Sequence, residues 1–150
     1  MGRGRRRGGG KVKLDPFRDL IEDLGKIFDL PLEPDRQKSC SIVIDEKFKV
    51  QLELSRMQDK IILGAYLGVV PPGRFRENLL AHALKANAIY PRVGTLGYSP
   101  YHNQLALFDF LPLEGLNSEK LADQLALFIA KGNEWLDALK TGTLPKIYVS

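Results

Sequence analysis

The sequence predicts an α+β fold in which helices pack on an antiparallel sheet, in the order αβββαββα. Two kinds of pattern lead to this prediction. Residues 47–55 alternate apolar and polar side chains, as a half-buried antiparallel strand does. Residues 16–28 and 118–141 repeat apolar residues with the period of a helix. Strands and helices do not alternate regularly along the chain, so a doubly wound parallel sheet is not expected.

The first helix has a clear start and a clear end. Asp15 is a favoured N-cap residue, and Pro16 suits the first helical position because its backbone angle is preset. The segment LPLEP at 30–34 ends the helix. From periodicity alone, the apolar stripe of this helix is interpreted as core; it consists of Phe17, Leu20, Ile21, Leu24 and Phe28.

Three strands are expected next, at residues 39–45, 47–55 and 60–70. The third strand carries Gly64 and Gly68 on the same face as Ile62 and Tyr66. Glycine inside a strand is typical of a place where a helix or a second chain approaches closely.

The second half of the chain should form a helix, two strands and a long helix. The helix runs from about Arg74 to Ile89, and its many alanines indicate packing on more than one side. A short strand at 95–98 and a longer one at about 104–111 follow. The last helix begins near Asn117 or Ser118, which are good caps, and Gly142 ends it. Residues 143–150 should be a loose tail.

Charge divides the chain into a basic arm and a mildly acidic body. The formal net charge is +4, but residues 1–13 contain six Arg and Lys residues and no acid. The remainder has 16 basic against 18 acidic residues. The arm is rich in Arg and Gly, so we expect it to be disordered. It is a solvated tail, an artefact of start-codon choice, or a weak RNA-binding segment. The body at 14–142 should be one domain.

The sequence contains no recognisable catalytic, nucleotide or metal motif. Cys40 is the only cysteine, so it cannot form an internal disulfide, and its apolar face predicts a buried thiol rather than a reactive one. His82 is interpreted as a packing or interface residue, His102 as exposed, and Trp135 as core. Asp109 should face solvent or pair with a cation. We therefore expect neither enzymatic activity nor a cofactor.

The order of elements, with three quoted segments, resembles a known family. The segments are ENLLAHALKANAI, the GTLGY turn that follows it, and NQLALFDFLPLEGLNSEKLADQLALFIAKGNEWLDAL. Together they resemble the class I type III secretion chaperones, the Tir-chaperone (CesT-like) family of bacterial proteins. The resemblance covers roughly residues 14–140. The basic arm departs from the family, whose members are typically small and acidic.

The resemblance implies a cytoplasmic homodimer that carries the extended N-terminal segment of a secreted effector, without ATP of its own, and delivers it to the secretion-system ATPase. Cargo would enter an apolar groove and extend the sheet. The implied cargo-binding residues are Leu20, Leu24, Phe28, Ile42 and Ile44, with the helical ones only partly buried. The implied dimer-interface residues are Phe75, Leu79, Ala83, Ala86, Leu96 and Tyr98.

A small RNA-binding protein that uses the Arg/Gly arm is the alternative. The body does not support it, because it has no basic stripe and no aromatic RNA-binding strand. Nucleic acid is therefore not among the expected partners. No apolar run reaches the ~18 residues that a membrane span needs, so membrane insertion is not expected either.

Overall fold

The computed structural model describes residues 15–90 and 93–147. The predicted basic arm lies outside the described residues. The order of elements is the predicted one, αβββαββα. The helices are α1 (Pro16–Phe28), α2 (Arg74–Asn87) and α3 (Ser118–Thr141), and the strands are β1 (Ser39–Ile44), β2 (Phe48–Leu54), β3 (Lys60–Val69), β4 (Thr95–Ser99) and β5 (Gln104–Pro112).

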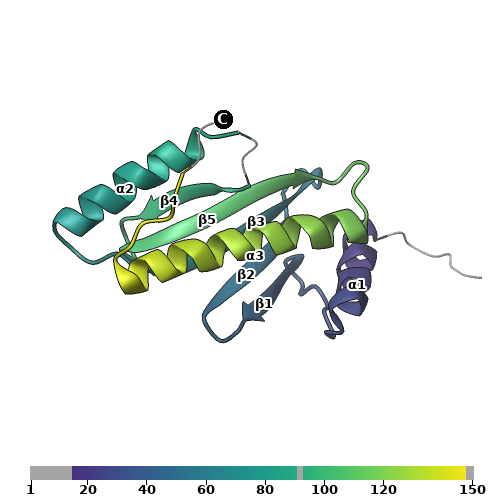
Figure 1. Cartoon of the computed structure of the whole chain (residues 1–150). Coiled ribbons are helices and arrows are strands. Elements are labelled where there is room, and N and C mark those ends of the chain that lie inside the picture. Colours follow the sequence, from purple (N-terminus) through teal and green to yellow (C-terminus); the bar gives the residue numbers. More distant parts are fainter. Residues whose placement is uncertain (1–14, 91–92, 148–150) are drawn as a thin grey trace, which may run out of the picture.

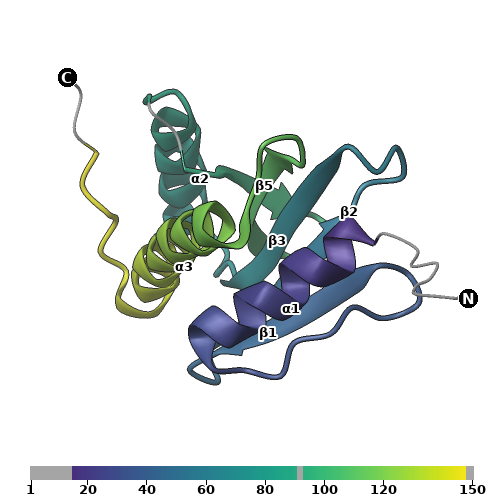
Figure 2. The ribbon, with the colours of Figure 1, turned by 90° about the vertical axis from the view of Figure 1, so that its right-hand side faces the viewer.

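The strands form one antiparallel sheet in the order β1-β2-β3-β5-β4, so β1 and β4 are its edges. Helices α1 and α3 lie over one face of the sheet, and α2 lies beside β4 (Figure 1). Figure 2 shows α1 extended across β1 and β2. The α+β prediction is therefore confirmed.

The core lies between the sheet and the two helices on its covered face. Every second residue of β2 is buried, as the alternation predicted, and the residues between them face the uncovered side of the sheet. The apolar stripes of α1 and α3 close the core from above. Its fully buried side chains include Phe17, Ile21, Leu52, Leu63, Leu107, Leu121, Phe128 and Trp135.

Both predicted helix starts are made by the predicted caps. The Asp15 carboxylate accepts from the Arg18 N–H at 3.0 Å, and the Asn117 side chain accepts from the Lys120 N–H at 2.8 Å. Each cap satisfies a backbone donor that has no partner within the helix. Gly142 ends α3 in the left-handed conformation, as expected.

The two glycines of β3 have different surroundings. A Cβ on Gly68 would lie 3.1 Å from Leu139 Cδ1, so α3 makes the close approach that the sequence predicted there. A Cβ on Gly64 would have no atom within 4 Å. Gly64 instead helps to line a hollow on the uncovered face, between Ile62, Tyr66 and Phe108.

The described part of the expected tail, residues 143–147, has no helix or strand but is not detached from the body. Leu144 is half-buried and packs against the core. The chain turns back after α3 and runs beside α2 (Figures 1 and 2).

Candidate functional site

The outer edge of β1 offers unpaired backbone groups. The Lys38 carbonyl accepts from the Leu54 N–H at 3.0 Å, so even-numbered residues here point their backbone groups toward β2. Odd-numbered residues point theirs away, since the direction alternates along a strand. Asp35 pairs with the outer groups of Ser39, through its own N–H at 2.8 Å and its carboxylate at 3.0 Å. Ser41 and Val43 are left facing outward, with no further strand beside them among the described residues.

The opposite edge of the sheet is partly closed by a side chain. Asn87, the last residue of α2, donates through Nδ2 to the Leu96 carbonyl oxygen and accepts from the Leu96 N–H, both at 2.9 Å. The amide thus takes the place of a neighbouring strand at Leu96 of β4. Because an unpaired edge recruits other strands, β1 is the better candidate for binding an extended segment.

An apolar hollow of about 220 Å³ adjoins the open edge on the covered face of the sheet. Ile42 and Ile44 of β1 line it together with Phe28 at the end of α1. Leu125 and Ile129 of α3 line it as well, and Leu30 and Val43 complete its apolar lining. An added strand beside β1 would point alternate side chains toward this hollow, because strand side chains alternate between faces.

Three of the five predicted cargo-binding residues meet at this hollow, and two do not. Phe28 is 36 % exposed, whereas Leu20 is only 8 % exposed and Leu24 is fully buried. The expectation that Leu20 and Leu24 are partly exposed is therefore wrong for the single chain. Leu20 and Leu24 lie before the C-terminal end of α1, in the part of the helix that packs against α3 and the sheet. There they belong to the core.

Four apolar residues at this hollow were not predicted as binding residues: Leu30, Val43, Leu125 and Ile129. Val43 is 63 % exposed and points away from the core side of β1, so the apolar face of the strand does not include it. Leu125 and Ile129 belong to the apolar stripe of α3, and periodicity does not distinguish a residue that borders a hollow from one in the core. Their distance from β1 in the sequence gave no signal that they would meet it.

The predicted dimer-interface residues are largely internal. Leu79, Ala83 and Leu96 are buried within the chain, and Phe75, Ala86 and Tyr98 are half-buried. Their inward faces pack α2 and β4 on the core. The predicted interface residues of α2 are therefore not the ones that would contact a second copy, because a side chain buried by its own chain is not available to a partner.

The exposed side of α2 carries a different stripe of small and apolar residues. Ala81 and Leu84 lie on it at helical spacing, Ala88 continues the row directly after the last residue of the helix, and Leu84 is 72 % exposed. We call these three residues the α2 stripe. Nothing in the described residues covers this side of α2, so the stripe is available to a partner.

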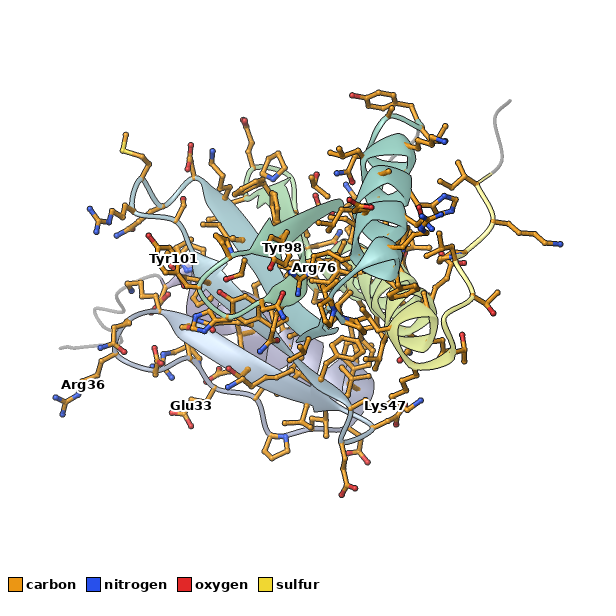
Figure 3. All side chains as sticks on the ribbon, turned by 90° about the vertical axis from the view of Figure 1, so that its left-hand side faces the viewer. Glu33, Arg36, Lys47, Arg76, Tyr98 and Tyr101 are labelled. Carbon is orange, nitrogen blue, oxygen red and sulfur yellow. The ribbon has the colours of Figure 1, made fainter. Side chains whose placement is uncertain are left out.

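A polar cluster holds the start of α2 against the sheet. The guanidinium of Arg76 lies over the Tyr98 ring, 6.0 Å from its centroid, and donates to the Val70 carbonyl oxygen at 3.0 Å. Figure 3 shows the Arg76 and Tyr98 side chains lying beside each other. Asn103 donates to the same carbonyl at 3.1 Å and accepts from the Tyr98 hydroxyl. These contacts are structural, since they tie α2 to the ends of β3 and β4.

The residues that could carry chemistry occupy the places that sequence predicted. Cys40 is buried and Trp135 lies in the core, while His102 is exposed. Burial raises the pKa of the Cys40 thiol. His82 packs against Trp135, with 5.8 Å between ring centroids, and its Nε2 donates to the Pro145 carbonyl oxygen. Residues 15–90 and 93–147 contain no group of three His, Cys, Asp or Glu that could hold a metal ion.

None of the helices in those two stretches has the length and apolarity that crossing a membrane requires.

Residues 19–136 match the model of the Tir chaperone protein (CesT) family. No curated protein matches the chain. Among solved structures, a chain of the HopA1–SchA chaperone–effector complex is similar, with 22 % identity and a TM-score of 0.65. The match covers 84 % of this chain and all of that one.

Two further structures have the same fold. One is a chain from the Yersinia pestis type III secretion chaperone SycH in complex with a fragment of YscM2, at 17 % identity, a TM-score of 0.65, and coverage of 78 % of this chain and 97 % of that one. The other is from the ExoT–SpcS complex of Pseudomonas aeruginosa, at 20 % identity, a TM-score of 0.63, and coverage of 81 % and 98 %.

Proposed function

The chain belongs to the Tir chaperone protein (CesT) family, and from this premise we propose that it is a bacterial type III secretion chaperone that holds the N-terminal segment of an effector in extended form. The observation that carries the proposal is the juxtaposition at β1. There an open strand edge lies directly beside an apolar hollow. The similar chains from the HopA1–SchA chaperone–effector complex and from the complex of the chaperone SycH with YscM2 support a protein ligand.

The effector segment would pair with the outward backbone groups of Ser41 and Val43. Alternate side chains of the segment would then enter the hollow between Phe28 and Ile129, and the others would lie beside the exposed Val43 side chain. This is strand addition with pockets for alternate residues. The site would therefore select a segment with apolar residues at every second position.

Backbone pairing alone is too weak to hold the effector. Two residues with outward N–H and C=O groups offer up to four hydrogen bonds, worth about 2–6 kcal/mol net. A micromolar complex needs about 8 kcal/mol after the cost of ordering the segment. Apolar side chains in the hollow must supply the difference, at roughly 25 cal/mol per Å² buried. Affinity would therefore depend mainly on the residues that enter the hollow.

The chaperone would act as a homodimer joined through α2. The α2 stripe supports this, because three small or apolar residues are exposed on one side of a helix that buries only Leu79 and Ala83 against its own core. Small residues allow two copies of the helix to approach closely in a two-fold contact. The cytoplasm would be its compartment and the secretion-system ATPase the partner that releases the effector.

The family match supports protein binding rather than the RNA-binding alternative. That alternative depended on residues 1–13, which lie outside the match at residues 19–136. The proposed function is not catalytic: the chaperone would keep an aggregation-prone segment soluble by covering its apolar residues.

A single substitution on the outer edge of β1 tests the proposal. Val43→Pro removes a backbone N–H that points away from β2, so it leaves the ladder within the sheet intact. Val43→Thr is the matched control, because it keeps the N–H and the branched shape. The readout is the affinity for N-terminal segments of secreted proteins from the same bacterium, measured by calorimetry.

We expect Val43→Pro to weaken binding at least tenfold and Val43→Thr to change it little. Circular dichroism would check that both variants stay folded. Unchanged binding in a folded Val43→Pro variant would rule out strand addition at this edge.

A further inference from the structure

We propose that residues 143–147 form a strap that holds α2 in the position from which it contacts a second copy of the chain. Helix α3 ends at Gly142, and the chain then turns back toward α2 (Figure 1). The strap is not part of the family match, which ends at residue 136. The effect of the strap on dimer formation rests on the proposed function, but its stabilisation of α2 within a single chain does not.

Helix α2 has little core contact of its own. Only Leu79 and Ala83 are buried, whereas the shorter α1 buries Phe17, Leu20, Ile21, Leu24 and Gly25. Its two ends are fixed by the Arg76 cluster and by Asn87 on β4. The middle of the helix, on the side that faces α3, depends on other contacts.

The strap supplies contacts at that place. Leu144 packs against the core, and the Pro145 carbonyl oxygen accepts from His82 Nε2 in the middle of α2. The His82 ring in turn packs against Trp135 of α3. One histidine thus joins three elements, so loss of the strap would remove one side of this arrangement.

The strap also forms a wall of the hollow of about 400 Å³ between α2 and α3. Ala86 and Ile89 come from the α2 side, Leu127 and Trp135 from α3, and Pro145 and Ile147 from the strap. Without the strap, the apolar residues on the inner side of α2 would be more exposed to solvent than they are now. Local opening of the helix would then cost less free energy, because less apolar area would be buried in the closed state.

The experiment is amide hydrogen exchange on the full chain, with α2 compared with α1. Leu144→Asp should detach the strap, because it places a carboxylate at a half-buried position against the core. Thr143→Asp is the matched control, since it adds the same charge at the exposed neighbouring residue. Both are made in a Leu84→Arg background, where charge on the α2 stripe suppresses the dimer and exchange reports on the single chain.

We expect Leu144→Asp to speed exchange in residues 74–87 roughly tenfold, while residues 16–28 keep their rate and Thr143→Asp changes neither. Unchanged exchange in α2 would show that residues 143–147 do not stabilise this helix. An equal rise in α1 would also contradict the proposal, because the segment would then stabilise the whole core and not α2 in particular.

A second measurement separates the strap from the dimer. Without the Leu84→Arg change, Leu144→Asp should raise the dimer dissociation constant about tenfold in sedimentation, and Thr143→Asp should not. A dissociation constant unchanged by Leu144→Asp would overturn the link between strap and dimer. If the unaltered chain is a monomer at all concentrations, the dimer proposal fails, and the exchange rates in α2 still decide whether the strap exists.

Discussion

Leu24 and Phe28 lie one turn apart on α1 and share its apolar stripe, yet their surroundings differ. Leu24 is fully buried, while Phe28 is at the end of the helix and borders the hollow beside β1. The periodic pattern gives both the same interpretation, because it records which side of the helix is apolar and not how far the covering elements extend. Because Leu24 is buried and Phe28 is partly exposed, substitutions at the two positions should have different effects on stability and on binding.

Leu24→Asp should destabilise the chain strongly, whereas Phe28→Glu should leave it nearly as stable and weaken effector binding. A carboxylate at the Leu24 position would be buried without a partner, at a cost of about 4 kcal/mol or more out of a total of roughly 5–15. At Phe28 the carboxylate can reach solvent, so we expect a loss of stability of about 1 kcal/mol. Urea unfolding and calorimetric titration with an effector segment measure the two effects. A Leu24→Asp variant with the same free energy of unfolding as the unaltered chain would show that the stripe is not core.

Cys40 should react with an alkylating reagent at least about a hundredfold more slowly in the folded chain than in urea. Its thiol is buried, and burial raises its pKa, so little thiolate is available without local opening. At alkaline pH the unfolded chain ionises this thiol first. The free energy of unfolding should therefore fall as pH rises past the ordinary thiol pKa. Mass spectrometry after timed iodoacetamide treatment gives the rate, and equal rates in both states would contradict burial.

At the scale of elements, the two edges of the sheet have different roles. Asn87 covers β4 at Leu96, and β1 keeps an open edge next to the hollow. Helix α2 lies at the partly closed edge with the α2 stripe outward. Effector binding and dimer formation are thus proposed at opposite edges, so each can be disturbed without the other.

Leu84→Arg should convert the dimer into a monomer and leave the fold intact. Leu84 is 72 % exposed in the single chain, so the arginine costs little there, but it would bring two like charges together across a two-fold contact. Sedimentation at micromolar protein gives the molecular mass, expected near 16.8 kDa for the variant. Lys85→Arg, which keeps the charge of an exposed neighbour on the same helix, is the control. A variant that stays dimeric would move the interface away from the α2 stripe.

For the whole molecule, the net positive charge and the folded body come from different parts of the chain. The six basic residues at 3–13 give the chain its positive sign, while the described body contains the proposed sites. Removing residues 1–10 should leave the melting temperature and effector affinity unchanged, because the tract has no apolar side chain to bury beyond Met1. The same deletion should remove any salt-sensitive RNA binding. Calorimetry and filter binding at two salt concentrations check both points. A large fall in melting temperature would show that the arm packs on the body.

The sequence alone determined the order of the elements, their ends and the α+β class. These depend on short-range physics: alternation in residues 47–55, the Asp15 and Asn117 caps, and the glycine at 142 are all local. The tertiary structure alone decided which apolar residues stay exposed. Leu79 and Leu84 look alike in the sequence, and only the packing of α2 beside β4 buries the first and leaves the second free. The hollow beside β1 likewise joins Phe28 and Ile44 to Ile129, because packing depends on contacts between segments far apart in the chain, which periodicity does not encode.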